Sequence, residues 1–137
     1  MYRRILVPVD LAHADKLEKA LKTAADLAGH YGIEAVYVGV TSSTPDQIAR
    51  NPAEFETKLK AFADDQAKHH GHKTSTRAYV SHDPAIDLDS TLLAAIGELS
   101  ADLVVMASHV PTVADYLWPS NGGTVASHST ATVMIVR

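Results

Sequence analysis

Ile5-Leu6-Val7-Pro8-Val9-Asp10 is the stretch that decides the fold, a short apolar run that ends in a carboxylate. Three other runs share its β-branched, nearly continuous apolar character, at residues 35–40, 103–107 and 133–136. Runs of this kind are typical of strands buried on both faces of a parallel sheet. Residues 77–80 form a weaker fifth strand candidate.

Helical patterns fill the gaps between these runs. Apolar residues recur at helical spacing over residues 17–28, 55–62 and 88–99. A fourth, shorter helix carries Val125 and is capped by Ser120 or Asn121. The resulting β-α-β-α-β-α-β-α-β order predicts an α/β fold. We expect one domain over residues 1–137, with a doubly wound, mostly parallel five-stranded sheet and helices on both faces.

Local signals suggest where the helices begin and end. Asp15 and Glu18 have the spacing of a capping box for the first helix, and Gly29 is a candidate for its end. Gly71 is the expected end of the second helix. Residues 41–53, which contain two prolines, are expected to form a surface loop.

Composition excludes several classes of function. The chain has 137 residues, a formal net charge of −4 and no cysteine. A weakly acidic domain is a poor candidate for nonspecific binding to nucleic acid or membranes, and the absence of thiols excludes disulfides and thiol catalysis. No apolar run reaches the length of a transmembrane helix or resembles a signal peptide, so we expect a cytoplasmic protein.

Familiar catalytic and metal-binding motifs are also missing. The sequence contains no P-loop, dinucleotide-binding or nucleophile-elbow motif, which disfavours a P-loop ATPase, a dinucleotide enzyme or a hydrolase that uses Ser108 and His109. His69, His70 and His72 cluster at the end of a predicted helix. Their spacing matches no defined zinc pattern, and a helix C-terminus favours histidine on dipole grounds alone, so we expect no metal site.

Three strand ends are candidates for a binding site. In an open α/β sheet, ligands bind beyond the carboxyl ends of the strands, where the strand order reverses. This rule directs attention to residues 8–10, residues 40–42 and the segment from Ala107 onward.

These same places resemble the universal stress protein family. The opening strand that ends in Pro8-Val9-Asp10, the segment Ala107-Ser108-His109 and the closing run at residues 133–137 are similar to short bacterial members. The resemblance implies a five-stranded fold of the adenine-nucleotide α-hydrolase type, a homodimer formed through the last strand, and, as in many members, bound ATP with Mg²⁺ possible beside it.

The resemblance also implies roles for individual residues. Asp10 would approach the ribose and Val40 the adenine, residues 106–110 would contact the ribose and first phosphate, and Ser120 and Asn121 would lie at the outer phosphates. The nucleotide-binding set expected on this basis is Pro8, Val9, Asp10, Val40, Met106, Ala107, His109, Val110, Ser120, Asn121 and Gly122.

The chain departs from the family's phosphate motif at each of its three glycines. Ala107, Val110 and Pro119 stand where glycines are expected, and a proline offers no N–H to a phosphate. No Lys or Arg lies between Ala107 and Arg137. Amides that follow Pro119 could instead form an anion-binding nest.

Three hypotheses remain open. The favoured one is a regulatory protein in stress response that binds ATP or a related adenine nucleotide, signals to an unidentified protein partner, and hydrolyses ATP slowly at most. The second is a dimeric interaction protein that has lost the nucleotide. The third, least favoured, is an enzyme of the related α-hydrolase folds.

Overall fold

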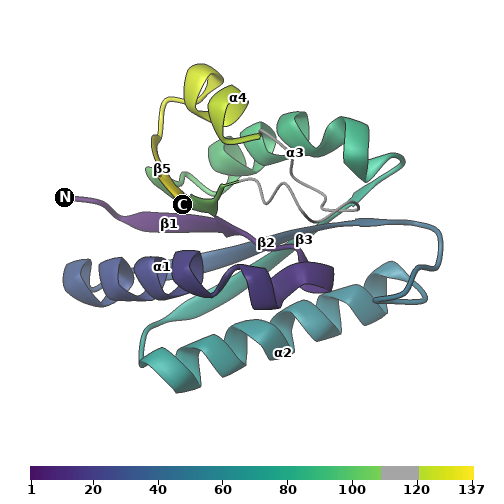
Figure 1. Cartoon of the computed structure of the whole chain (residues 1–137), viewed down its shortest axis with the longest axis horizontal. Helices are drawn as coiled ribbons and strands as arrows, with labels where there is room; N and C mark the ends of the chain where they lie inside the picture. Colours follow the sequence, from purple (N-terminus) through teal and green to yellow (C-terminus); the bar gives the residue numbers. More distant parts are fainter. Residues whose placement is uncertain (109–120) are drawn as a thin grey trace.

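The computed structural model describes residues 1–108 and 121–137, and for Ala85, Asn121 and Gly122 it describes the backbone alone. Its strands are β1 (Arg4–Pro8), β2 (Glu34–Ser42), β3 (Thr74–Ser81), β4 (Leu103–Ala107) and β5 (Thr132–Val136). Its helices are a 3₁₀ segment, η1 (Leu11–Lys16), and α1 (Glu18–Tyr31), α2 (Pro52–His70), α3 (Pro84–Glu98) and α4 (Asn121–His128), all drawn in Figure 1. The predicted alternation of strands and helices is confirmed.

The five strands form one sheet in the order β3-β2-β1-β4-β5. Every pairing is parallel, so the expected mostly parallel sheet is parallel throughout. In the centre of the sheet, Leu6 lies opposite both Val36 and Val104. The central strands are almost wholly buried, whereas β3 and β5 are partly exposed at the edges, which explains why the β3 sequence is the weakest strand signal.

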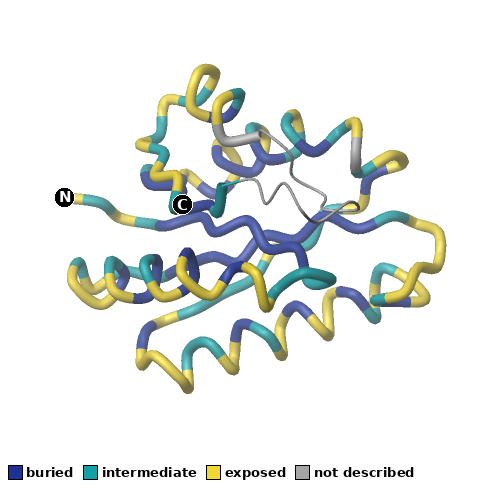
Figure 2. Tube along the Cα trace, in the orientation of Figure 1, coloured by how far each residue is buried: buried dark blue, intermediate teal, exposed yellow. Residues whose placement is uncertain are grey.

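Helices cover both faces of the sheet. In Figure 1, α1 and α2 lie on one face, and α3 and α4 lie on the other. Figure 2 shows that burial concentrates along the central strands and on the sides of the helices that face them. The buried apolar residues form one continuous cluster, which packs the central strands against the helices.

Backbone chemistry at the helix ends explains most of the helix boundaries. Gly32 and Gly71 end α1 and α2 in the left-handed conformation that glycine adopts without steric cost. Asn51 caps α2, because its side chain accepts a hydrogen bond from the Glu54 N–H, and Pro52 follows at the first helical position. The expected end of the second helix at Gly71 is confirmed.

Two expected boundaries of the first helix are wrong. Gly29 lies inside α1, and the helix continues to Tyr31. No capping box forms at Asp15, because η1 occupies residues 11–16 and α1 begins only at Glu18, without a side-chain cap. The side-chain cap found in this region is Asp10, which precedes η1 and accepts a hydrogen bond from the Ala12 N–H.

The loop expected at residues 41–53 is shorter than predicted. Strand β2 continues to Ser42, since residues 35–42 pair with β3 over the full length of that strand. Helix α2 begins at Pro52, which leaves residues 43–51 as the connection. Within the described parts of the chain, no helix has the length and apolar character needed to cross a bilayer.

Candidate functional site

A cavity of about 350 Å³ opens where β1 and β2 end. It lies next to the point where the strand order reverses, since β1 pairs with β2 on one side and with β4 on the other. Open α/β sheets bind their ligands in this position. Its described lining residues are Val9, Asp10, Leu11, Ala12, His13, Val40, Thr41, Ser42, Asp46, Gln47, Ile48, Phe55 and Pro84.

Asp10 is held firmly at the end of β1. Asp10 is only 7% exposed. Its Oδ1 accepts a hydrogen bond from the Ala12 N–H at 3.1 Å, and its Oδ2 lies 2.9 Å from His13 Nδ1. This arrangement follows from the Asp-x-x-His spacing on the tight turn of η1. An ionised carboxylate can accept about four hydrogen bonds, so these two contacts fix its orientation and leave acceptor capacity for a ligand.

The carboxyl end of β2 supplies a largely apolar wall. Val40 and Thr41 are buried, and the Ser42 hydroxyl lies 2.8 Å from the Thr44 hydroxyl and also accepts from the Thr44 N–H at 3.1 Å. Phe55 reaches the same cavity from the first turn of α2. Val9, Val40 and Phe55 therefore bring apolar surfaces from three elements to one space, a setting that suits a flat aromatic ligand.

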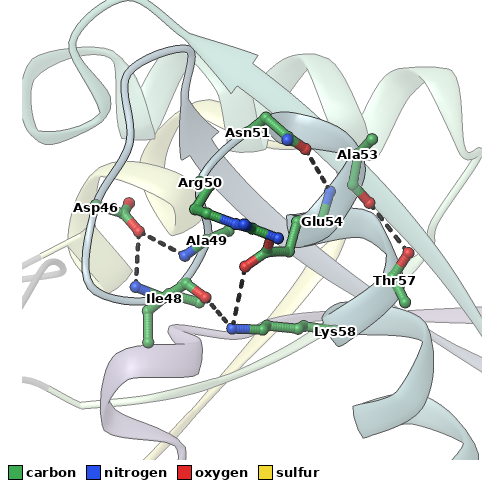
Figure 3. Close-up of polar contacts among 9 residues, drawn as sticks. All are labelled: Asp46, Ile48, Ala49, Arg50, Asn51, Ala53, Glu54, Thr57 and Lys58. Carbon is green, nitrogen blue, oxygen red and sulfur yellow. Dashed lines mark hydrogen bonds and ion pairs between the residues drawn. The ribbon is translucent and has the colours of Figure 1, made fainter.

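The connection from β2 to α2, which we call the strap (residues 43–51), forms another wall. Asp46 Oδ1 accepts hydrogen bonds from the N–H groups of Ile48 at 2.8 Å and Ala49 at 2.9 Å, and the Asp46 N–H donates to the Ala49 carbonyl at 2.9 Å. These bonds close a compact turn (Figure 3). The turn aligns Ile48 with the cavity.

Polar side chains of helix α2 bind the strap. The Lys58 ammonium donates to the Ile48 carbonyl and lies 3.5 Å from Glu54 Oε1, and Arg50 Nε donates to Glu54 Oε2 at 2.9 Å (Figure 3). The hydrogen bond from Arg50 holds the pKa of Glu54 below its usual value. One carboxylate thus joins two cations that come from the strap and the helix.

The structure brings together part of the expected nucleotide-binding set. Val9, Asp10 and Val40 line the cavity, and Pro8 is buried at the end of β1. Met106 is 1% exposed in the core, while Ala107 is half-buried at the end of β4, and neither lines the cavity. Their contact with a nucleotide stays a prediction.

The remaining expected residues lie after β4. His109, Val110 and Ser120 are outside the described residues, as is Pro119. Asn121 and Gly122 are the first residues of α4, so the predicted short helix is confirmed, but only their backbone is described. The phosphate part of the prediction is therefore untested.

Sequence reasoning missed most of the other lining residues of the cavity, four of which matter for its shape and charge. His13 was detectable from the Asp-x-x-His spacing after a strand, and Asp46 from its position as an Asx-turn residue in a loop. Ile48 carries no signal of its own, because a backbone turn places it. Phe55 fits the helical core pattern, and it is indeed 5% exposed, but it also lines the cavity.

The histidines at the end of α2 have a structural arrangement. His72 is buried, with Nε2 2.9 Å from the Tyr37 hydroxyl, and the ring of His70 lies 6.1 Å from that of His72. Within residues 1–108 and 121–137, no three His, Asp or Glu side chains are grouped in a way that would hold a metal ion.

Comparison with known proteins supports the sequence resemblance. The model of the "Universal stress protein family" matches residues 1–137. "Universal stress protein G" of Salmonella typhimurium is 29% identical over 142 residues, and that of Escherichia coli O157:H7 is 28% identical over 151 residues, with all of each chain covered.

Solved structures share the fold. A universal stress protein in complex with cAMP has a TM-score of 0.72 at 23% identity, covering 99% of this chain and 97% of that one. The universal stress protein of Archaeoglobus fulgidus in complex with dAMP has a TM-score of 0.68 at 18% identity, with 99% and 98% covered. At these identities the likeness establishes the fold alone, a five-stranded parallel sheet with helices on both faces.

Proposed function

The chain belongs to the universal stress protein family, and on that premise we propose that it is a regulatory protein of the stress response that binds an adenine nucleotide. The observation that supports this most is the cavity at the ends of β1 and β2, in which the Asp10 carboxylate stands beside apolar walls. Two proteins of the same fold were crystallised with cAMP and dAMP, which are both adenine mononucleotides.

The cavity chemistry suggests how the nucleotide lies. Asp10 retains acceptor capacity for ribose hydroxyls after its bonds to Ala12 and His13. The adenine ring would pack between Val40 and Phe55, which offer apolar surface without competing polar groups. Phosphate would extend toward the start of α4 at Asn121 and Gly122, because the first N–H groups of a helix have no partner within the helix. Mg²⁺ could accompany a nucleotide with several phosphates.

We propose that this binding serves signalling to a protein partner, with ATP hydrolysis slow at most. Among the described lining residues there is no Lys or Arg to stabilise phosphoryl transfer. The cytoplasm, where adenine nucleotides are abundant, is the expected compartment.

A second function, that of a dimeric interaction protein without a nucleotide, has its own support. Among the strands that the structure describes, β5 pairs with β4 alone, and its Met134 and Ile135 are 38% and 39% exposed. Large apolar side chains on an unpaired strand edge favour association with another chain. The same feature supports the homodimer expected from the family, so the two hypotheses differ only in whether the cavity is filled.

Calorimetric titration of the nucleotide-stripped protein with AMP, cAMP and ATP tests the proposal. The informative variant is Asp10→Asn, which keeps an oxygen for the Ala12 N–H but loses the charge and one acceptor. Asp26→Asn, an exposed carboxylate of α1 paired with Lys22, is the control. We expect saturable binding that weakens about tenfold in Asp10→Asn alone, the usual cost of one charged hydrogen bond. If no nucleotide binds at millimolar concentration, the interaction-protein hypothesis replaces the proposal.

A further inference from the structure

The cavity wall carries negative charge and little to balance it. Its described lining residues include two carboxylates, Asp10 and Asp46, and no Lys or Arg. The one basic side chain among them is His13, whose Nδ1 already lies 2.9 Å from Asp10 Oδ2. Asp46 points its Oδ1 at the N–H groups of Ile48 and Ala49, so its charge is fixed beside the cavity by the strap.

The nearest cations of the strap and α2 are engaged elsewhere. Arg50 is paired with Glu54 at 2.9 Å, and its side chain is 85% exposed. Lys58 is bonded to the Ile48 carbonyl and lies 3.5 Å from the same Glu54. Neither residue lines the cavity, and Glu54 offsets part of their charge.

The segment from the end of β4 to the end of β5 adds no Lys or Arg side chain. From Ser108 to Val136 the sequence contains no Lys and no Arg, while it does contain Asp115. Whatever part of this segment approaches a ligand therefore does so with amides, hydroxyls and histidines. Such groups can satisfy one phosphate group by hydrogen bonding, but they do not offset the repulsion among several phosphates and the carboxylates with a positive side chain.

We infer, on the basis of the nucleotide site proposed above, that this cavity selects an adenine nucleotide with a single phosphate group and discriminates against the free triphosphate. A cyclic monophosphate carries one negative charge and a monophosphate at most two, whereas free ATP brings several into the field of Asp10 and Asp46. The discrimination arises from the charges of Asp10 and Asp46. It does not require a steric clash between the protein and the second or third phosphate.

The salt dependence of nucleotide affinity shows whether the cavity repels or attracts phosphate charge. The experiment is a calorimetric titration of the full chain with adenosine, cAMP, AMP and ATP in EDTA, at about 20 mM and about 300 mM NaCl, which span a wide range of Debye lengths. Adenosine reports changes that do not depend on ligand charge. We expect ATP to bind about tenfold more weakly than cAMP at low salt, and the gap to narrow at high salt as the repulsion is screened.

Other outcomes would refute the inference in distinguishable ways. If ATP binds more tightly than cAMP and loses affinity as salt rises, the site attracts phosphate charge and the inference is wrong, although the proposed nucleotide site stands. If none of the four ligands binds, adenosine included, the proposed function itself fails and takes the inference with it.

The variant Asp46→Asn tests the origin of the selectivity. Asparagine keeps the oxygen that accepts from Ile48 and Ala49, so the turn is preserved while the charge is removed. We expect the affinity for ATP to rise about threefold relative to that for adenosine, a magnitude typical of one exposed charge, and the affinity for cAMP to rise less. Asp26→Asn should change neither ratio. An unchanged ATP-to-cAMP ratio in Asp46→Asn, in a variant with native circular dichroism, would show that Asp46 is not the source.

Discussion

Gly39 in β2 and Phe55 in α2 are packed so closely that a side chain at Gly39 would collide with the aromatic ring. A β-carbon placed on Gly39 would lie 2.7 Å from Phe55 Cζ and 3.3 Å from Leu59 Cδ2. The same ring lines the cavity. The absence of a side chain at one strand residue therefore sets the position of a wall of the proposed site.

Gly39→Ala should disturb both stability and binding. Because the clash involves the far end of the Phe55 side chain, the ring can move, but it must then leave its present contacts. We expect a loss of about 1–3 kcal/mol in the free energy of unfolding, as for other overpacked cores, together with weaker nucleotide binding. Chemical denaturation and calorimetry measure the two effects.

Gly29→Ala is the matched control for this substitution. Gly29 lies inside α1, and a β-carbon there meets no atom within 4 Å. Alanine should stabilise the helix by about 0.5–1 kcal/mol and leave binding unchanged. If the two alanine variants have equal stability and affinity, the Phe55 ring is not constrained by Gly39.

His72 should make the fold sensitive to acid. Its ring is buried, Nε2 lies 2.9 Å from the Tyr37 hydroxyl, and Nδ1 has no hydrogen-bond partner among residues 1–108 and 121–137. Burial first, and the neighbouring His70 second, lower the pKa of His72 from its usual value of 6.5. The unfolded chain therefore takes up the proton first as the pH falls, so stability is full above pH 6.5 and declines below it, down to the lowered pKa of the folded state.

The measurement is chemical denaturation from pH 8 to pH 5 in the wild type and in His72→Gln. Glutamine can still bond to Tyr37 but does not titrate, so we expect this variant to lose less stability over the acid range. His69→Gln removes an exposed histidine of the same helix end and should keep the wild-type pH dependence. Parallel curves for all three proteins would contradict the assignment to His72.

The architecture was predictable because its determinants are local in the sequence. The buried central strands are continuous apolar runs, and the strand-end rule directed attention to residues 8–10 and 40–42, of which Val9, Asp10 and Val40 line the cavity. The start of α1 was not predictable, because the short 3₁₀ segment η1 precedes it and shows no apolar periodicity. Asp15, the expected cap of α1, lies inside η1, which is itself capped by Asp10.

The cavity residues on the strap and α2 were harder to predict than those at the ends of β1 and β2. Ile48 is aligned by a turn that Asp46 closes through backbone N–H groups, and Lys58 bonds to a backbone carbonyl ten residues away. Contacts to the backbone leave no pattern of side-chain types in the sequence. Phe55 was assigned to the core correctly, but its second role depends on the space left by Gly39.

Removing the Lys58 ammonium should loosen the strap. In Lys58→Met the side chain keeps much of its length but loses its bonds to the Ile48 carbonyl and Glu54. We expect faster hydrogen exchange in residues 43–51, weaker nucleotide binding, and a loss of about 0.5–1.5 kcal/mol in stability for the lost hydrogen bond.

Lys60→Met is the control for the strap prediction. Lys60 belongs to the same helix, is exposed, and lies 3.6 Å from Asp64, so its contacts are confined to the helix surface. Its removal should alter neither exchange in residues 43–51 nor binding. Equal exchange in the two variants would mean that the turn at Asp46 holds the strap without help from α2.

The exposed edge of β5 should carry the proposed homodimer. Two copies related by a twofold axis can pair this edge antiparallel, and Met134 and Ile135 would then leave water together. We expect the wild type to have twice the chain mass of 14.7 kDa in light scattering, and the Ile135→Lys variant to have the mass of one chain. Val80→Lys places the same charge on β3, at the opposite edge of the sheet, where Val80 is 55% exposed, and should leave the dimer intact. Dissociation by Val80→Lys alone would move the interface to β3, because only the edge that pairs is sensitive to an added charge.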